Sequence, residues 1–385
     1  MTQRVICREG ALGELASVVA ETGARSVFLV TGRTSYAASG AEARLSATLA
    51  GLSVTRFCDF EENPKIENVV AGIDAFRRAD PDVVIAVGGG TAMDLAKIIN
   101  NLAAREHDAV DYIEGREAIE PGGRPLIAIP TTAGSGSQAT PFSVVYLDRT
   151  KCSAGHPSML PDVAIVDPAL LKSLPSHVAA ASGLDALCQG IESYWSIHAT
   201  EQSREKAREA IALAWASLAT FVNQPGDASR LAMARAAHLA GEAISITRTT
   251  APHAISYPIT AHYGVAHGHA VGLLLPSILV YNAGVTDSDC LHPDGPGHVR
   301  RILEELATLL GAQKPSQAAR LFGSLMDEIG LTRDFPALGI RAQADIDTIV
   351  ENGFNPQRVN NNPRRLTAEA LRKMLATLLE RQNQI

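Results

Sequence analysis

The stretch DVVIAVGGGTAMDLAK, residues 82–97, decides the fold. Its apolar run at 82–87 leads into three glycines, a threonine and a segment with helical spacing. A short apolar run bounded by glycine is typical of a buried parallel strand. We therefore predict a strand, a tight turn and a helix, whose first backbone N–H groups can bind a diphosphate. Three glycines alone are a weak signal, because an ordinary strand–helix turn has the same residues.

The flanking sequence alternates between strand-like and helix-like segments. We predict strands at 26–32, 54–57 and 125–129 and helices at 41–52 and 69–78. This alternation favours a doubly wound, Rossmann-like parallel sheet. The last strand is followed by a second loop rich in hydroxyls and glycine, PTTAGSGS, at 130–137. Open α/β sheets bind ligands at the carboxyl ends of their strands, so two such loops on neighbouring strands favour a nucleotide site.

The second half of the chain has a different pattern. From about residue 167 the strand-like runs stop, and apolar residues recur at helical spacing. Helices are predicted at 201–220, 228–246, 297–310, 316–329 and 367–381, with Thr367 as the N-cap of the last. We predict a nucleotide-binding α/β domain over 1–170 and an all-helical metal and substrate domain over 171–385, with the boundary between Asp167 and Pro175.

Four potential metal donors lie in the helical half. Asp185 and Gln189 are four residues apart and therefore point the same way from one helix, whereas His253 and His267 would have to converge on them from elsewhere. A carboxylate and two imidazoles suit Zn²⁺ or Fe²⁺, while an amide is an unusual and weaker fourth donor. Each histidine taken alone is more often an ordinary polar residue than a metal ligand.

The composition narrows the class of protein. The chain has 385 residues, 46% of them hydrophobic, a net charge of -7 and a pI near 5.9. An acidic chain without a Lys/Arg block is not expected to bind nucleic acid or a membrane surface. Five cysteines without a CxxC pair favour a reducing compartment, and we expect a cytoplasmic protein because no signal-peptide pattern or long apolar run occurs.

Several motifs in order resemble the iron-containing alcohol dehydrogenase family. They are GGGTAMDLAK (88–97), IPTTAGSGSQAT (129–140), LPDVAIVDPALLKSLP (160–175), SGLDALCQGIESYWS (182–196) and the segment with the two histidines. The resemblance covers essentially the whole chain. It implies the dehydroquinate synthase-like fold, with a nucleotide domain, an all-helical domain, and NAD(P) and a divalent metal between them. Members are commonly dimers or larger, so we expect a homodimer.

The same resemblance implies the cofactor residues. The diphosphate and nicotinamide half would be bound by Gly88, Gly89, Gly90, Thr91 and Asp94, and the adenine and ribose side by Thr131, Thr132, Ser135 and Lys151. Members that prefer NAD usually have an aspartate after the first strand, where it repels a 2′-phosphate. This chain has Gly32, Arg33 and Thr34 there, which accommodate an anion, so we predict NADP(H) over NAD(H).

The family's metal ligands correspond to Asp185, Gln189, His253 and His267, and the second is normally a histidine. We therefore expect a weakly bound Fe²⁺ or Zn²⁺. Tyr257 stands where some members have a proton-relay histidine. A phenol with a pKa of ~10 is a poor proton shuttle but can donate a hydrogen bond, and His262 and His269 are alternative proton donors.

The segments 151–157, 185–196 and 247–260 resemble the branch of the family that reduces phosphonoacetaldehyde to 2-hydroxyethylphosphonate in phosphonate biosynthesis. A dianionic substrate needs nearby cations, and Arg248 is the first candidate, ahead of Arg364 and Arg365. The alternative for Arg248 is a solvated arginine at a helix end. Other functions left open are a general primary-alcohol dehydrogenase or aldehyde reductase, a lyase related to dehydroquinate synthase, and a nucleotide-binding protein without turnover.

Overall fold

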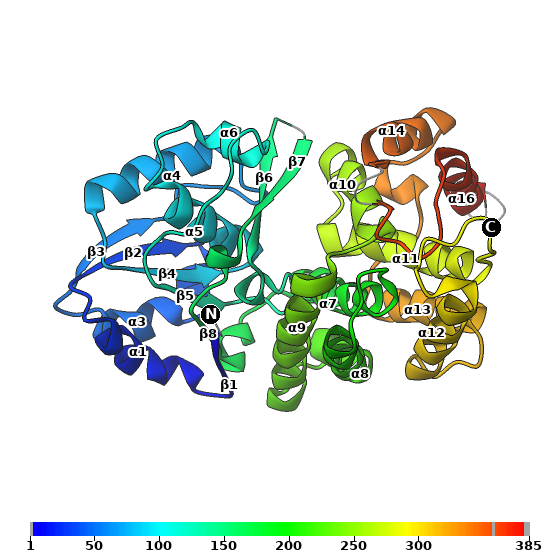
Figure 1. Ribbon diagram of the computed structural model, residues 1–385. Coiled ribbons are helices and arrows are strands. Elements are labelled where there is room, and N and C mark those ends of the chain that lie inside the picture. Colours follow the sequence, from blue (N-terminus) through cyan, green and yellow to red (C-terminus); the bar gives the residue numbers. More distant parts are fainter. Residues whose placement is uncertain (1–2, 149, 356–358, 381–385) are drawn as a thin grey trace. The chain divides into compact units, whose positions relative to one another are not determined.

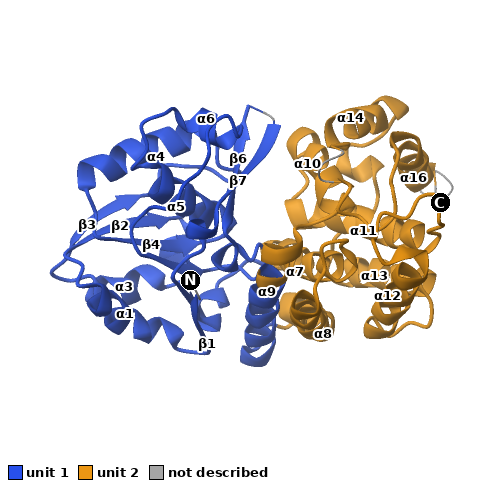
Figure 2. Cartoon of the chain, viewed as in Figure 1, with its two compact units in different colours: residues 1–175, 225–241 blue, residues 176–224, 242–385 orange. Residues whose placement is uncertain are grey.

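A computed structural model describes residues 3–148, 150–355 and 359–380. The chain divides into two compact units, residues 1–175 with 225–241 and residues 176–224 with 242–385 (Figure 2). The sequence pattern did not indicate that 225–241, the start of helix α9 (Asp227–Thr247), belongs with the first unit. The physical reason is close backbone packing, since a Cβ added at Gly241 would lie 2.5 Å from the carbonyl oxygen of Gly136.

The first unit contains a six-stranded parallel sheet with the strand order β1-β8-β5-β4-β2-β3. Its strands are β1 (Arg4–Cys7), β2 (Ser26–Thr31), β3 (Ser53–Phe57), β4 (Val83–Gly88), β5 (Leu126–Pro130) and β8 (Val163–Val166). The apolar runs that predicted β2, β4 and β5 are buried nearly throughout, as expected for the centre of a parallel sheet. The sequence pattern did not predict β1, β8 or the antiparallel hairpin of β6 (Phe142–Leu147) and β7 (Thr150–Gly155).

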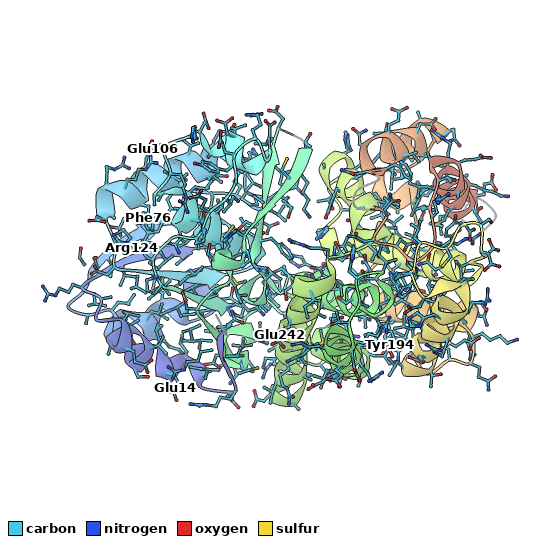
Figure 3. The ribbon with its side chains drawn as sticks, in the orientation of Figure 1. Glu14, Phe76, Glu106, Arg124, Tyr194 and Glu242 are labelled. Atoms are coloured by element: carbon cyan, nitrogen blue, oxygen red, sulfur yellow. The ribbon has the colours of Figure 1, made fainter. Side chains whose placement is uncertain are left out.

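Helices cover both faces of the sheet (Figure 1), which confirms the doubly wound prediction. One core combines the sheet with α4 (Ile66–Ala79) and α5 (Gly90–Leu102). Phe76, labelled in Figure 3, belongs to this core, and its ring packs edge-on against Phe28 with centroids 5.2 Å apart. The other core contains α1 (Leu15–Thr22) and α3 (Ala41–Thr48). The short helices α2 (Ser35–Ala38) and α6 (Ala109–Ile113) complete this unit.

The second unit is helical, and its central helix is α7 (Ser176–Trp195). Around it lie α8 (Glu201–Asn223), α10 (Ala251–Tyr263), α11 (His267–Ala283), α12 (Gly295–Leu309), α13 (Pro315–Glu328), α14 (Gln343–Gly353) and α16 (Ala368–Glu380). Helix α11 approaches α7 closely, because a Cβ added at Gly268 would lie 2.0 Å from the carbonyl oxygen of Ala181. The Thr367 hydroxyl accepts from the Ala370 N–H at 3.1 Å, as expected of an N-cap. No helix in the described ranges is long and apolar enough to cross a bilayer.

Candidate active site

The two predicted nucleotide loops lie together at the carboxyl ends of β4 and β5. The Thr131 N–H donates to the carbonyl of Gly88 at 2.9 Å. A Cβ added at Gly90 would lie 2.9 Å from Ser135 Oγ, and one at Gly89 would lie 3.5 Å from Thr132 Cγ2. The glycines therefore allow the hydroxyl-rich loop to pack against the first turn of α5. The result is a half-buried helix N-terminus beside several hydroxyls, a suitable place for a diphosphate.

Asp94 holds the second loop in place. Its carboxylate accepts from Ser137 Oγ at 2.5 Å and from the Val144 N–H at 2.9 Å, and it lies 3.2 Å from Lys97 Nζ. The side chain is 14% exposed. A direct contact of Asp94 with the nicotinamide remains a prediction, whereas its positioning of residues 137–144 is seen directly.

Lys97, which our sequence reasoning missed, completes this arrangement. Its ammonium is fully buried and donates to the carbonyls of Ser137 at 3.1 Å and Thr140 at 3.3 Å, and also to that of Phe142. The signal in the sequence is a lysine three residues after Asp94, on a helix whose neighbouring positions are apolar.

Two arginines lie near the carboxyl end of β2: Arg33 follows the strand, and Arg56 is on the neighbouring strand β3. Arg33 forms an ion pair with Asp59, whose side chain is 91% exposed. Arg56 Nε donates to Thr31 Oγ1 at 2.9 Å, and its Nη2 lies 3.5 Å from the Gly32 carbonyl oxygen. Exposed ion pairs are weak, so Arg33 can exchange Asp59 for a phosphate at low cost. Of the other predicted cofactor residues, Thr34 precedes α2, and Lys151 lies on β7 opposite Tyr146.

Three of the four predicted metal donors converge. Asp185 of α7, His253 of α10 and His267 at the start of α11 each offer one donor atom, and these atoms lie within 4.8 Å of one another. His253 Nε2 is 3.2 Å from Asp185 Oδ1, and the two histidine rings are 5.2 Å apart. Gln189 Nε2 donates to Asp185 Oδ2 at 3.0 Å. One carboxylate and two imidazoles fit a borderline divalent cation, and Gln189 orients the carboxylate.

Glu192 is a second residue that our sequence reasoning missed. It is fully buried, and one of its oxygens contacts His253 Nδ1. The other oxygen accepts from the Thr250 N–H at 2.7 Å and the Thr250 hydroxyl at 2.9 Å. A carboxylate behind a ligating histidine fixes the ring so that its other nitrogen faces the metal. The signal in the sequence is its position seven residues after Asp185, two turns along the same helix face.

The charge of His253 is set by its two acidic neighbours. Burial disfavours the charged imidazole, but Glu192 and Asp185 outweigh burial and raise the pKa of His253 to about 9. In the metal-free protein the two carboxylates therefore favour the protonated form of His253. A cation that binds Nε2 takes the place of that proton.

The candidates for proton transfer lie in different surroundings. Tyr257, one turn after His253, stacks on His267 with ring centroids 5.8 Å apart. His262 is exposed, and its ring contact is with Tyr263 rather than with the metal donors. Buried His269 donates Nε2–H to the carbonyl of Thr332 at 2.7 Å, and burial lowers its pKa. Tyr257 is therefore the candidate that the fold brings to the cluster.

The arginines proposed for the substrate also differ. Arg248 follows α9 with an exposed side chain and a φ of 59°, in the left-handed region. Arg364 donates to Asp289 at 2.7 Å and to the Tyr281 carbonyl at 2.5 Å, so it supports the fold. Arg365 is exposed. Arg364 is therefore committed to the fold, and Arg248 and Arg365 have the exposed side chains of the three.

Two family models match the chain. Residues 2–168 match iron-containing alcohol dehydrogenase, and residues 179–379 match the C-terminal part of the Fe-containing alcohol dehydrogenase family. Among curated relatives, the phosphonoacetaldehyde reductase of Streptomyces viridochromogenes is 39% identical over 318 residues, 80% of this chain and 79% of that protein. Long-chain-alcohol dehydrogenase 1 of Geobacillus thermodenitrificans is 36% identical over 277 residues, 71% of this chain and 70% of that one.

The fold is also similar to solved structures. The sulfoacetaldehyde reductase of Bifidobacterium kashiwanohense, in complex with NAD+, superposes with a TM-score of 0.88 at 29% identity. The match covers 98% of this chain and 97% of that one. An iron-containing alcohol dehydrogenase from Thermococcus thioreducens gives a TM-score of 0.87 at 26% identity, over 98% of each chain.

Proposed function

We propose that this chain, which belongs to the iron-containing alcohol dehydrogenase family, reduces a small anionic aldehyde with NADPH. This family consists of oxidoreductases, and membership implies NAD(P) and a divalent metal. The preferred substrate in this proposal is phosphonoacetaldehyde, which is reduced to 2-hydroxyethylphosphonate. Support comes from two similar proteins whose names specify an aldehyde with an acidic group, a phosphonate and a sulfonate.

The observation that carries the proposal is the backbone of Arg248. The left-handed backbone conformation costs a residue with a side chain roughly 1–2 kcal/mol of conformational free energy, whereas glycine or asparagine tolerates it better. The adjacent backbone is anchored to α7, because Thr247 Oγ1 lies 2.9 Å from Ser193 Oγ and Thr250 is bound by Glu192. An exposed guanidinium on a fixed, strained backbone suits a ligand, and its planar donors match phosphonate oxygens.

The chain's own residues divide the remaining tasks. When bound, the nicotinamide supplies a hydride and the divalent ion polarises the aldehyde oxygen. Asp185, His253 and His267 would hold the ion, and Glu192 keeps His253 oriented. Tyr257, stacked on His267, would donate a hydrogen bond to the oxygen that gains negative charge. Arg248 would hold the phosphonate, and fixing a small substrate in attack geometry is itself a large contribution to rate.

The test compares phosphonoacetaldehyde with acetaldehyde in the Arg248→Ala variant. A charge-assisted hydrogen bond contributes about 1.5–3 kcal/mol, so kcat/KM for phosphonoacetaldehyde should fall about 10- to 150-fold, mainly through KM. The value for acetaldehyde should change little. Arg248→Lys should recover part of the loss, and Arg320→Ala is the matched control at an exposed arginine of α13. Equal losses on both aldehydes would contradict the clamp.

The coenzyme preference has its own test. We expect a higher kcat/KM with NADPH than with NADH, and a reversal of this preference in Gly32→Asp, because a carboxylate there repels a 2′-phosphate. A Cβ at Gly32 would lie 2.2 Å from Ser35 Oγ, so the substitution is made together with Ser35→Ala, and Ser35→Ala alone is the control. A wild-type preference for NADH would refute this part of the proposal.

A general alcohol dehydrogenase is the second candidate, favoured by the similarity to long-chain-alcohol dehydrogenase 1. Propanal distinguishes the two functions. A kcat/KM for propanal equal to or above that for phosphonoacetaldehyde would favour the general enzyme. We also propose that the protein is a homodimer, which light scattering on the eluting protein would test.

A further inference from the structure

Arg56 is a cation near the nucleotide loops that the sequence motifs did not include among the coenzyme residues. It lies on β3, where its Cα is paired with that of Leu29 on β2. The side chain extends along β2 beyond this pairing, because Nε donates to Thr31 Oγ1 at 2.9 Å and Nη2 lies 3.5 Å from the Gly32 carbonyl oxygen. The guanidinium therefore lies beside Gly32, where the sequence predicts room for a 2′-phosphate.

Gly32 is close to the turn that we expect to bind the diphosphate. A Cβ added at Gly88, the last residue of β4, would lie 3.5 Å from the Gly32 backbone nitrogen. Strands β2 and β4 are neighbours in the parallel sheet, so their carboxyl ends share one edge. Open α/β sheets bind nucleotides at this edge. A nucleotide that binds at the Gly88 turn therefore has Gly32 and Arg56 close to it.

The Arg56 guanidinium is held in place before a ligand binds. Its Cζ lies 4.7 Å from the centroid of the Tyr36 ring, and Tyr36 is buried. This aromatic contact and the hydrogen bond from Nε to Thr31 fix the guanidinium. Arg33 differs, because its side chain is 63% exposed and its ion-pair partner Asp59 is 91% exposed. Binding an anion to Arg56 therefore costs less side-chain entropy than binding it to Arg33.

Arg56 keeps hydrogen-bond donors for a ligand. A guanidinium has five N–H groups, and Nε uses one of them on Thr31. The two other contacts among the described residues are long, since Nη1 is 3.5 Å from Glu42 Oε1 and Nη2 is 3.5 Å from the Gly32 carbonyl oxygen. The Glu42 side chain is 51% exposed, and an exposed carboxylate at this distance is a weak partner. A phosphate dianion can therefore displace Glu42 and bind both Nη groups.

We propose that Arg56 is the specificity-determining residue that binds the 2′-phosphate of NADPH. The planar fork of an arginine matches phosphate oxygens, and a nearby arginine commonly accommodates this phosphate in α/β nucleotide domains. Gly32 leaves space for the phosphate, Arg33 adds positive charge, and Glu42 competes for the guanidinium in the free protein. This inference rests on the proposed use of NADPH, and it places the specificity on β3 instead of on the loop after β2.

The test compares two nucleotides that differ only in the 2′-phosphate, adenosine 2′,5′-bisphosphate and 5′-AMP. Their affinities for the full-length protein are measured by calorimetry, without a substrate. In Arg56→Gln the affinity for the bisphosphate should fall about 10- to 150-fold, as expected for a lost charge-assisted hydrogen bond, while that for 5′-AMP should change less than about twofold. A merely structural role of Arg56 would weaken both nucleotides equally and would contradict the proposal.

Further variants separate the contributions of the neighbouring charges. Glu42→Gln removes the competing carboxylate, so the affinity for the bisphosphate should rise about two- to fivefold. Arg33→Gln should lower that affinity less than Arg56→Gln does, because Arg33 is not held in place. Arg25→Gln is the matched control, since Arg25 is an exposed arginine directly before β2, at the opposite end of the strand, and both affinities should stay unchanged.

The outcomes distinguish this proposal from the proposed function. If the wild-type protein prefers the bisphosphate and Arg56→Gln keeps that preference, the role of Arg56 is overturned while the use of NADPH stands. If the wild-type protein does not distinguish the two nucleotides, Arg56 and the NADPH preference both fail, whereas the aldehyde substrate is tested separately through Arg248. Should Arg56→Gln not fold, Arg56→Lys replaces it, because a lysine keeps the charge but not the fork and should still weaken bisphosphate binding selectively.

Discussion

Lys97 in the first unit and Glu192 in the second are both fully buried ionisable side chains, but their surroundings differ. The Lys97 ammonium is surrounded by carbonyl oxygens and the Asp94 carboxylate, so its charge is neutralised within the fold. Glu192 and Asp185 are two carboxylates that share one imidazole, His253. Even with His253 protonated, this group keeps a net negative charge.

The comparison separates a structural use of buried charge from a ligand-binding use. Burying an ion is costly unless it is paired and hydrogen-bonded. Around Lys97, protein groups supply all the pairing and hydrogen bonds without a ligand. As a result, the loop at 137–142 is held beside the turn between β4 and α5. Around Glu192 and Asp185 the pairing is only partial, and a divalent cation would complete it. Substitutions at the two sites should therefore affect different quantities, stability at Lys97 and metal affinity at Glu192.

The largest effect is expected for Lys97→Met. Removing one partner of a buried ion pair leaves the other charge and several carbonyls without a donor, which costs about 3–5 kcal/mol. Urea denaturation should show this loss in the free energy of unfolding. Lys172→Met is the control, because Lys172 is 52% exposed in its ion pair with Asp227 and should contribute less than ~1 kcal/mol. A small effect at Lys97 would remove the contrast between the two sites.

Glu192→Gln should mainly change metal binding. Loss of a carboxylate behind a ligating histidine typically weakens metal affinity 10- to 100-fold. Zn²⁺ titration by calorimetry measures this directly, without an activity assay. Glu305→Gln, at a partly exposed glutamate of α12 that accepts from Tyr194 at 2.9 Å, is the control and should leave the affinity unchanged. An unchanged affinity in Glu192→Gln would mean that Glu192 only supports the fold.

Gln189→His tests the weak fourth donor. An imidazole on the same turn as Asp185 adds a stronger ligand, so we expect metal affinity to rise about tenfold. Gln189→Leu separates two uses of the amide. Its hydrogen bond to Asp185 at 3.0 Å would be lost, and affinity should fall modestly because the carboxylate is no longer oriented. A weaker site in Gln189→His would show that the cavity does not admit the larger ring.

The smallest effect is a pH dependence of the metal-free protein. The folded-state pKa of His253, about 9, is above the ~6.5 of an unfolded chain. The charged imidazole therefore adds stability that is fully present below pH ~6.5 and is lost as pH rises through about 9. Urea midpoints measured in EDTA should fall between pH ~7 and ~10, and less so in Glu192→Gln. An equal fall in both proteins would assign the effect to other groups.

Much of the secondary structure of the first unit can be predicted from local sequence. The apolar runs of β2, β4 and β5 are long enough to mark buried strands, and GGGT marks the turn between β4 and α5. The sequence pattern did not identify the short apolar runs of β1, RVIC, and β8, VAIV, as strands. Only the folded structure identifies them, because they pair with each other, Arg4 opposite Val163, from distant parts of the sequence.

In the metal half, the spacing of Asp185 and Gln189 predicted their common helix face, and the resemblance to a family supplied His253 and His267. Neither source indicated Glu192, because its function depends on a contact with a histidine 61 residues later. The spacing also did not indicate that the Gln189 amide is directed at Asp185. Such contacts depend on how α7, α10 and α11 pack, which short-range periodicity does not encode.

The sequence by itself determined the strand–glycine–helix turn, the change from alternating elements to helices, and the family, because each depends on residues that are near neighbours in the chain or on a motif order. Only the tertiary structure decided that Lys97 closes a loop, that Glu192 stands behind His253, that Arg248 has a left-handed backbone, and that residues 225–241 join the first unit. The physical reason is that the charge and strain of a buried group are set by the atoms packed around it, and those atoms come from distant parts of the chain.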